Sequence, residues 1–289
     1  MLLSTLLSNS EAWYNLTQSD ISVLEKVDEE LLRKIFHAHS KTPLELLYLE
    51  SGSIPIRFIL MSRRLNFLWY ILNENEETLI SKFFTAQVNK PVKGDWVSRV
   101  KLDLTELDLN HDFKEIKAKT KIEFKRIVKS KILEKAFQYL TSLQATKSKS
   151  KNIVYSELSI QDYLKPECKL SIKEKAFTFA TRTSMLDLKS NFKNGLSDIL
   201  CRKCNLEDET QKHILFCPAI SDLSILKVDQ IPKYEDIFKN SVDKIESLTK
   251  ILLQKFNLLH QVHRPSTEIS VDKSCAATNE CTLVELELK

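Results

Sequence analysis

One segment of the chain reads Cys201-Arg-Lys-Cys204-Asn-Leu-Glu-Asp-Glu-Thr-Gln-Lys-His213-Ile-Leu-Phe-Cys217-Pro218, which is the pattern C-x2-C-x8-H-x3-C. Two cysteines separated by two residues form a tight turn whose thiolates converge on one point. His213 and Cys217 are four residues apart and therefore lie on the same face of a helix. Three sulfurs and one imidazole are a ligand set that Zn²⁺ takes in tetrahedral sites. The spacing predicts a zinc site with Cys201, Cys204, His213 and Cys217 as ligands.

The residues around these four agree with that geometry. An acidic run ends at Thr210, which is a plausible helix start, and Pro218 ends the helix just after the last ligand. Four protein ligands would close the coordination shell, so the predicted site is structural and not catalytic. The alternative reading is that these residues are buried thiols that share this spacing by chance.

Glycine is scarce along the whole chain. Only three of the 289 residues are glycine, where average usage would give about twenty. Doubly wound folds, sandwiches and nucleotide-binding loops need glycine for tight turns and close backbone approach. Together with many Leu, Lys and Glu residues, this composition predicts an all-α protein: an elongated multi-helix body with a small Cys-Cys-His-Cys zinc module.

Apolar residues recur every three or four positions over most of the chain, which indicates amphipathic helices. Expected helices are Ser19–Ile35, a helix that opens with a capping box at Thr42 and stops at Gly52, Pro55–Leu72, Glu76–Gln87, Asp95–Leu107, Asp112–Leu143 and Tyr234–His263. The predicted organisation is a helical domain over 1–110, a long basic helix and linker over 111–151, a helical segment over 152–218 that ends in the zinc module at 201–217, C-terminal helices over 219–264, and a disordered tail over 265–289.

Cysteine usage and hydropathy bear on the compartment. The first residues are apolar but short and lack a basic leader, so no secretory signal is predicted. No apolar run approaches the roughly 20 residues of a membrane span. Six cysteines without a secretory signal fit metal ligation in a reducing compartment better than disulfides. We expect an intracellular protein of the nucleus or cytoplasm, neither secreted nor membrane-bound.

Positive charge is concentrated in one part of the chain. Residues 111–151 hold 12 Lys or Arg against 4 acidic residues, although the whole chain has a net charge of only +4. A cationic helix of this kind is either a solvated surface or a phosphate-binding one. We expect it beside the zinc module, where both would hold a polyanion. The predicted nucleic-acid contacts are Lys114, Lys117, Lys121, Lys125, Arg126, Lys129, Arg202 and Lys203. Arg63-Arg64 is a second candidate.

Signals for catalysis are missing from the sequence. It contains no glycine-rich phosphate loop, no nucleophile elbow and no H-E-x-x-H motif. Cys168 follows Pro166 and is expected to be a packed thiol. The sequence therefore favours a binding protein over an enzyme.

Several short strings resemble a known family. They are Pro43-Leu-Glu-Leu-Leu-Tyr-Leu-Glu-Ser-Gly52, Ile54-Pro-Ile-Arg-Phe-Ile59, Arg63-Arg-Leu-Asn-Phe-Leu68, Pro91-Val-Lys-Gly-Asp-Trp96 and Tyr234-Glu-Asp-Ile-Phe238. They are similar, in this order, to the thumb and post-thumb region of reverse transcriptases from non-LTR (LINE-type) retrotransposons. The cysteine–histidine segment looks like the zinc-binding element that closes many of those polyproteins. The resemblance covers residues 1 to about 260 and implies a thumb-like domain over 1–110 that grips nucleic acid.

The chain also departs from that family. Such polymerases hold two Mg²⁺ ions with an aspartate pair, and this sequence contains no Asp-Asp pair and no Pro-Asp nuclease signature after the cysteine–histidine segment. Fingers and palm would be expected upstream of Met1. The resemblance thus implies a noncatalytic fragment that binds RNA or an RNA–DNA hybrid, such as element RNA and target DNA. Two alternatives remain: a helical protein-interaction scaffold with a structural zinc site, and, less in keeping with the missing carboxylates, an active polymerase.

Overall fold

Most helices begin at residues that the sequence marks as caps. In the computed structural model, the Thr17 hydroxyl accepts from Asp20 N while the Asp20 carboxylate accepts from Thr17 N, and this capping box starts the first long helix. Asp95 caps another helix by accepting from Ser98 N at 2.6 Å. Each cap satisfies a backbone N–H that has no partner inside the helix. The structure describes residues 5–147, 153–191, 198–221, 233–238 and 242–260.

The described residues form helices joined by turns and loops. Their only β-pairing is an isolated antiparallel bridge between Leu200 and Asp208. This confirms the all-α prediction. The elements are η1 (Ser10–Ala12), α2 (Gln18–Phe36), α3 (Leu44–Ser51), α4 (Ile56–Asn73), α5 (Leu79–Asn89), α6 (Trp96–Glu106), α7 (Phe113–Ala118), α8 (Lys121–Ala145), η3 (Asp162–Leu164), α9 (Ile172–Arg182), α10 (Gln211–Phe216), α11 (Pro218–Ser221), η5 (Tyr234–Phe238) and α12 (Val242–His260). Residues 148–151 of the predicted linker lie outside the described residues, and so does the predicted tail at 265–289.

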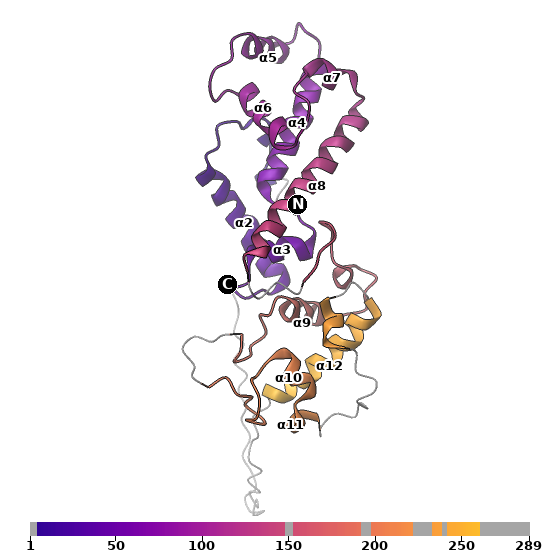
Figure 1. Ribbon diagram of the computed structural model, residues 1–289. Coiled ribbons are helices and arrows are strands. Elements are labelled where there is room, and N and C mark those ends of the chain that lie inside the picture. Colours follow the sequence, from indigo (N-terminus) through magenta and orange to yellow (C-terminus); the bar gives the residue numbers. More distant parts are fainter. Residues whose placement is uncertain (1–4, 148–152, 192–197, 222–232, 239–241, 261–289) are drawn as a thin grey trace, which may run out of the picture.

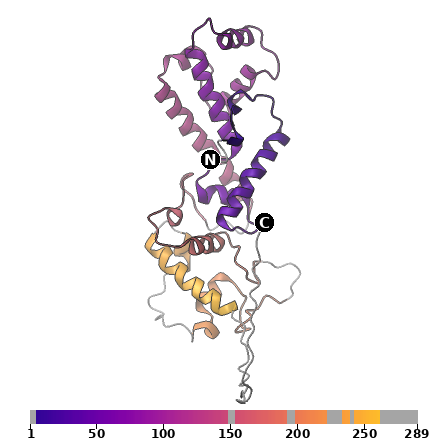
Figure 2. The same cartoon turned by 180° about the vertical axis from the view of Figure 1, so that it is seen from behind.

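Two lobes stack end to end along an elongated molecule (Figure 1). The first lobe contains η1 and α2–α8, with α4 and α8 packed lengthwise on each other. The second lobe contains α9–α12 and the cysteine–histidine segment. Seen from behind, α12 runs along the second lobe from the junction with the first lobe toward its far end (Figure 2).

A buried polar cluster joins the lobes. Arg182 of α9 donates from Nε to both carboxylate oxygens of Glu50 in α3, at 2.9 and 3.0 Å, and both side chains are essentially inaccessible to solvent. The Tyr155 hydroxyl donates to the same carboxylate at 2.5 Å. Beside them the rings of Phe36 and Phe179 stack with centroids 4.4 Å apart. The second lobe is therefore fixed on the first by buried charge and aromatic packing together.

Three sequence expectations about helix ends are wrong. The capping box at Thr42 does not form, because α3 starts after Pro43 with no side-chain cap, and Arg33 binds the backbone carbonyls of His39 and Thr42 instead. Tertiary contacts with Arg33 thus set this turn in place of the local cap.

The predicted helix Asp112–Leu143 is broken. The chain leaves α7 after Ala118, and Thr120 caps α8 through a capping box with Glu123. The Trp69 indole N–H donates to the Lys119 carbonyl at 2.9 Å, so the break is satisfied from α4. Likewise, the expected helix Tyr234–His263 is a 3-10 turn, η5, followed by α12.

Gly52 ends α3 at a point where only glycine fits. Its φ is +67°, and an added Cβ would lie 2.3 Å from Ile160 N and 2.5 Å from the Ser159 carbonyl carbon. The segment 159–161 is held there because Gln161 N donates to the Glu50 carbonyl at 3.1 Å. Gly94 also has a positive φ, +83°, but open space where its Cβ would be.

We therefore expect Gly52→Ala to destabilise the protein more than Gly94→Ala. Gly94→Ala carries only the left-handed backbone strain, about 1–2 kcal/mol. Gly52→Ala adds the cost of moving a packed backbone segment, about 1–3 kcal/mol more. Urea unfolding of both variants measures the difference, and equal destabilisation would contradict the close packing of residues 159–161 on α3.

Candidate metal centre

The cysteine–histidine segment forms a short hairpin followed by a helix. Cys201 N donates to the Glu207 carbonyl at 2.8 Å, and Glu209 N donates to the Ile199 carbonyl at the same distance. At the tip of the hairpin, Asn205 N donates to the Cys201 carbonyl and closes the turn that carries Cys204. The hairpin brings the first two cysteines toward α10.

Thr210 caps α10 as predicted, because its hydroxyl accepts from His213 N at 3.0 Å. His213 lies on the first turn of α10, and Cys217 directly follows its last residue. Pro218 then starts the short helix α11. The chain direction changes at this proline, as the sequence indicates.

The four predicted ligands converge. Their donor atoms all lie within 4.8 Å of one another, with Cys201 Sγ 3.9 Å from Cys217 Sγ and Cys204 Sγ 3.3 Å from His213 Nε2. Tetrahedral zinc–sulfur bonds of about 2.3 Å would place two sulfurs about 3.8 Å apart. Cys201, His213 and Cys217 are buried and Cys204 is partly exposed. The residues fit one metal ion without rearrangement of the backbone.

A carboxylate orients the imidazole. His213 Nδ1 lies 3.0 Å from Glu207 Oε2, so a proton on Nδ1 is shared with Glu207 and the lone pair of Nε2 faces the three sulfurs. Carboxylates in this position fix the ring orientation and make histidine a stronger metal ligand. This role of Glu207 was not predicted from the sequence. The local sequence signal for it is its position in the acidic run before α10.

The thiols of the cluster do not ionise equally. Burial, followed by the neighbouring Cys201, raises the pKa of the Cys217 thiol to about 12. Burial opposes ionisation of Cys204, but backbone N–H donors from Leu206 and Glu207 outweigh it and lower its pKa to about 7. A thiolate at Cys217 therefore needs a nearby cation, which is the electrostatic condition of a metal site.

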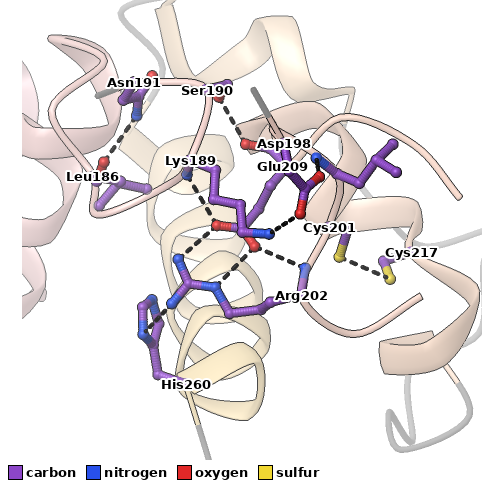
Figure 3. Close-up of polar contacts among 11 residues, drawn as sticks. Leu186, Lys189, Ser190, Asn191, Asp198, Cys201, Arg202, Glu209, Cys217 and His260 are labelled. Carbon is purple, nitrogen blue, oxygen red and sulfur yellow. Dashed lines mark hydrogen bonds and ion pairs between the residues drawn. The ribbon is translucent and has the colours of Figure 1, made fainter. Parts of the chain in front are cut away.

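Glu209 holds the hairpin together from inside (Figure 3). Its carboxylate is fully buried and accepts from the Arg202 backbone N at 3.0 Å, from Arg202 Nε and Nη2 at 2.8 and 2.7 Å, and from Lys189 N at 3.0 Å. Arg202 Nη1 lies 3.1 Å from His260 Nδ1, at the end of α12. The metal segment is thus tied to α12 and to the loop at 186–191.

These contacts place Arg202, one of the predicted nucleic-acid contacts, in an ion pair within the hairpin. Its guanidinium is committed to Glu209, and hydrogen bonding to this carboxylate raises the pKa of Arg202 further. Lys203 is half-buried and has an interaction of its own. The second candidate, Arg63-Arg64, is also structural: Arg64 forms a buried ion pair with Asp103 at 2.6 Å, and Arg63 donates to the Leu7 carbonyl.

The basic helix gives a different result. Its six predicted contacts are all exposed, and none forms an ion pair with an acidic residue in the described part of the chain; they are Lys114, Lys117, Lys121, Lys125, Arg126 and Lys129. By contrast, Lys131 pairs with Glu134 at 3.0 Å and Lys135 with Asp108 at 2.8 Å. Along these two helices, the cations without an ion-pair partner among the described residues therefore gather on α7 and on the N-terminal half of α8.

The cationic surface and the metal cluster do not lie side by side. The start of α8 is at one end of the molecule with α7, and α10 and α11 are at the other end, in both views (Figures 1 and 2). This corrects the expectation that the zinc module adjoins the basic helix. The two features cannot form one binding surface.

No protein-family model, curated protein or solved structure that we compared with the chain matches it. Within the ranges that the structure describes, no helix combines the length and the apolar composition needed to cross a bilayer. The other buried thiol, Cys168, donates to Glu246 at 3.4 Å and is packed as predicted.

Proposed function

We propose that the chain is a noncatalytic nucleic-acid-binding protein, similar to the thumb and zinc-binding part of a LINE-type reverse transcriptase, that binds RNA or an RNA–DNA hybrid. The observation that carries the proposal is the distribution of unpaired charge on α7 and α8. Lys121, Lys125 and Lys129 follow one another at intervals of one helical turn, and all three are exposed. Cations without carboxylate partners are free to replace the counterions of a phosphate backbone.

The metal in this proposal is Zn²⁺, and its role is structural. Three sulfurs and one nitrogen complete a tetrahedral shell and leave no position for a water nucleophile. Because the cluster lies far from α8, zinc would act by folding the second lobe and not by touching the same phosphates. The absence of an aspartate pair in the sequence supports a noncatalytic role.

Substituting Lys121, Lys125 and Lys129 together by glutamine tests the nucleic-acid proposal. We expect the affinity for a short RNA–DNA hybrid to fall roughly tenfold or more at low salt, and the slope of log affinity against log salt to decrease by about 2–3. Titration of a fluorescently labelled hybrid at several ionic strengths measures both quantities.

A matched control removes the same charge elsewhere. Lys173, Lys244 and Lys250 are exposed lysines of α9 and α12 in the second lobe. Their triple glutamine variant should bind the hybrid as the unmodified protein does. Equal losses in the two variants would mean that only net charge matters, and the α8 surface would no longer be the proposed site.

A protein-interaction scaffold is the second candidate, and an apolar groove favours it. The groove has a volume of about 230 Å³ and lies between η1, α4, α5 and α6, with Phe67, Phe83, Phe84 and Trp96 in its lining. Phe83 is 61% exposed, so part of this aromatic lining faces solvent, and contiguous apolar surface of this kind marks protein-interaction sites. Absence of saturable hybrid binding at every ionic strength would favour this candidate.

A further inference from the structure

Three arginine or lysine side chains are buried in the described part of the chain, and two of them face a carboxylate. Arg64 pairs with Asp103 and Arg182 pairs with Glu50. The third is Lys255 of α12, which is 2% exposed. A buried ammonium costs several kcal/mol unless a negative charge compensates it. The surroundings of Lys255 must therefore supply that charge in another form.

Lys255 lies beside the segment that carries the metal ligands. Its Nζ donates to the Leu215 carbonyl, two residues before the ligand Cys217, and no ion pair joins it to a carboxylate of the described residues. Burial lowers the pKa of Lys255, and Cys217 opposes this shift. A bound metal ion would make the Cys217 sulfur a thiolate and so supply a negative charge beside the ammonium. The neighbouring residues Phe256 and Leu259 pack against the same cluster.

The net charge of the metal-bound site is opposite to that of the Lys255 ammonium. One divalent ion, three thiolates and one neutral imidazole carry a net charge of −1. A single buried ammonium beside the site brings this total to zero. Glu207, which contacts His213, is 73% exposed and therefore screened by solvent. Of the other cations near the cluster, Arg202 is neutralised by Glu209, and Lys203 is only partly buried.

We propose that the ammonium of Lys255 is the counter-charge of the metal–thiolate centre. It raises the affinity of the site for a divalent ion that is held by three thiolates. This inference rests on the proposed metal site. Lys255 does not ligate the ion, so it is a positioning residue that acts through the electrostatics of the three sulfurs. Its ammonium stabilises the loaded site more than the empty one, because only the loaded site carries the matching negative charge.

Two substitutions separate the charge of Lys255 from its hydrogen bond. Lys255→Gln keeps an N–H donor for the Leu215 carbonyl but removes the charge, and Lys255→Met removes both. We expect both variants to bind zinc roughly tenfold or more weakly in competition with a chromophoric chelator, the range found for residues that surround metal ligands. Lys250→Met, on an exposed face of the same helix, should bind zinc as the unmodified protein does.

A change in the ligand set provides the decisive control. Cys204→His replaces the partly exposed sulfur and gives two thiolates and two imidazoles, whose complex with Zn²⁺ has no net charge. In this background Lys255→Gln should cost little or no zinc affinity. Cobalt absorption spectra would report that the tetrahedral geometry is retained in each variant.

The outcomes are distinct. Unchanged zinc affinity in Lys255→Gln, or an equal loss with and without Cys204→His, would overturn the counter-charge role. If Lys255→Gln folds with zinc only in the Cys204→His background, the role is supported; if it folds in neither, Lys255 is needed for packing and the inference fails. If the unmodified protein binds no zinc, the metal site itself is wrong.

Discussion

Replacing Arg182 with methionine is expected to lower the free energy of unfolding by about 3–5 kcal/mol, the cost of leaving one partner of a buried ion pair without the other. The Glu50 carboxylate would remain fully buried and would keep only the Tyr155 hydroxyl as a donor. The Ile237 carbonyl, which accepts from Arg182 Nη1 at 2.6 Å, would also lose its partner. Since the free energy of unfolding of a domain is only about 5–15 kcal/mol, this one substitution removes a large part of the stability of the junction between the two lobes.

Denaturant unfolding followed by circular dichroism measures this effect. The control is Arg126→Met, because Arg126 is exposed on α8 and forms no ion pair with a described acidic residue, and it should change stability by less than about 0.5 kcal/mol. Removing the carboxylate as well, in Arg182→Met with Glu50→Leu, should recover part of the loss. A loss below about 1 kcal/mol in Arg182→Met would show that the lobes do not depend on this pair.

Replacing Cys201 with serine is expected to abolish stoichiometric metal binding and to unfold the cysteine–histidine segment. Structural zinc sites contribute on the order of 10 kcal/mol of binding free energy, which is also folding free energy. Cys201 is completely buried between α10 and α12, among Ile214, Cys217 and Leu259. Without the metal, this small cluster is the main apolar packing that holds the hairpin.

Elemental analysis of the purified protein gives the metal content, and limited proteolysis reports the local fold. We expect about one zinc per chain in the unmodified protein and almost none in Cys201→Ser. Cys168→Ser is the matched control, since Cys168 is a buried thiol outside the cluster, and it should retain the metal. Full zinc content in Cys201→Ser would mean that the metal is held elsewhere.

Local sequence signals predicted the metal-binding segment of the second lobe and most of the helix starts. The spacing of three cysteines and one histidine predicted the ligand cluster, and Thr210 and Pro218 marked the two ends of α10. These predictions succeed because each depends on residues within about one or two helical turns of each other. Capping and ligand convergence of this kind need no information from distant parts of the chain.

Charged side chains were predicted less well. Arginines at 63, 64 and 202 read as surface charges in the sequence, yet Arg64 is buried and Arg202 binds the buried carboxylate of Glu209. Arg64 meets Asp103, 39 residues later, and Arg182 meets Glu50, 132 residues earlier. A charge pattern identifies which residues are ionised but not which of them become buried. Conversely, Lys121, Lys125 and Lys129 lie on the exposed face of α8, and none of them has an ion-pair partner among the described residues.

The amino-acid sequence by itself determined that the chain is helical, where most helices begin, and which four side chains can hold a metal, because glycine content, caps and ligand spacing act over short distances. Only the tertiary structure decided that α7 and α8 are separate, that the metal cluster and the cationic surface lie at opposite ends, and that the buried Lys255 donates to the Leu215 carbonyl, two residues before a metal ligand. Those features depend on which distant segments pack together. Burial then makes an unmatched charge costly, so the partners of each buried ion are fixed by the whole fold.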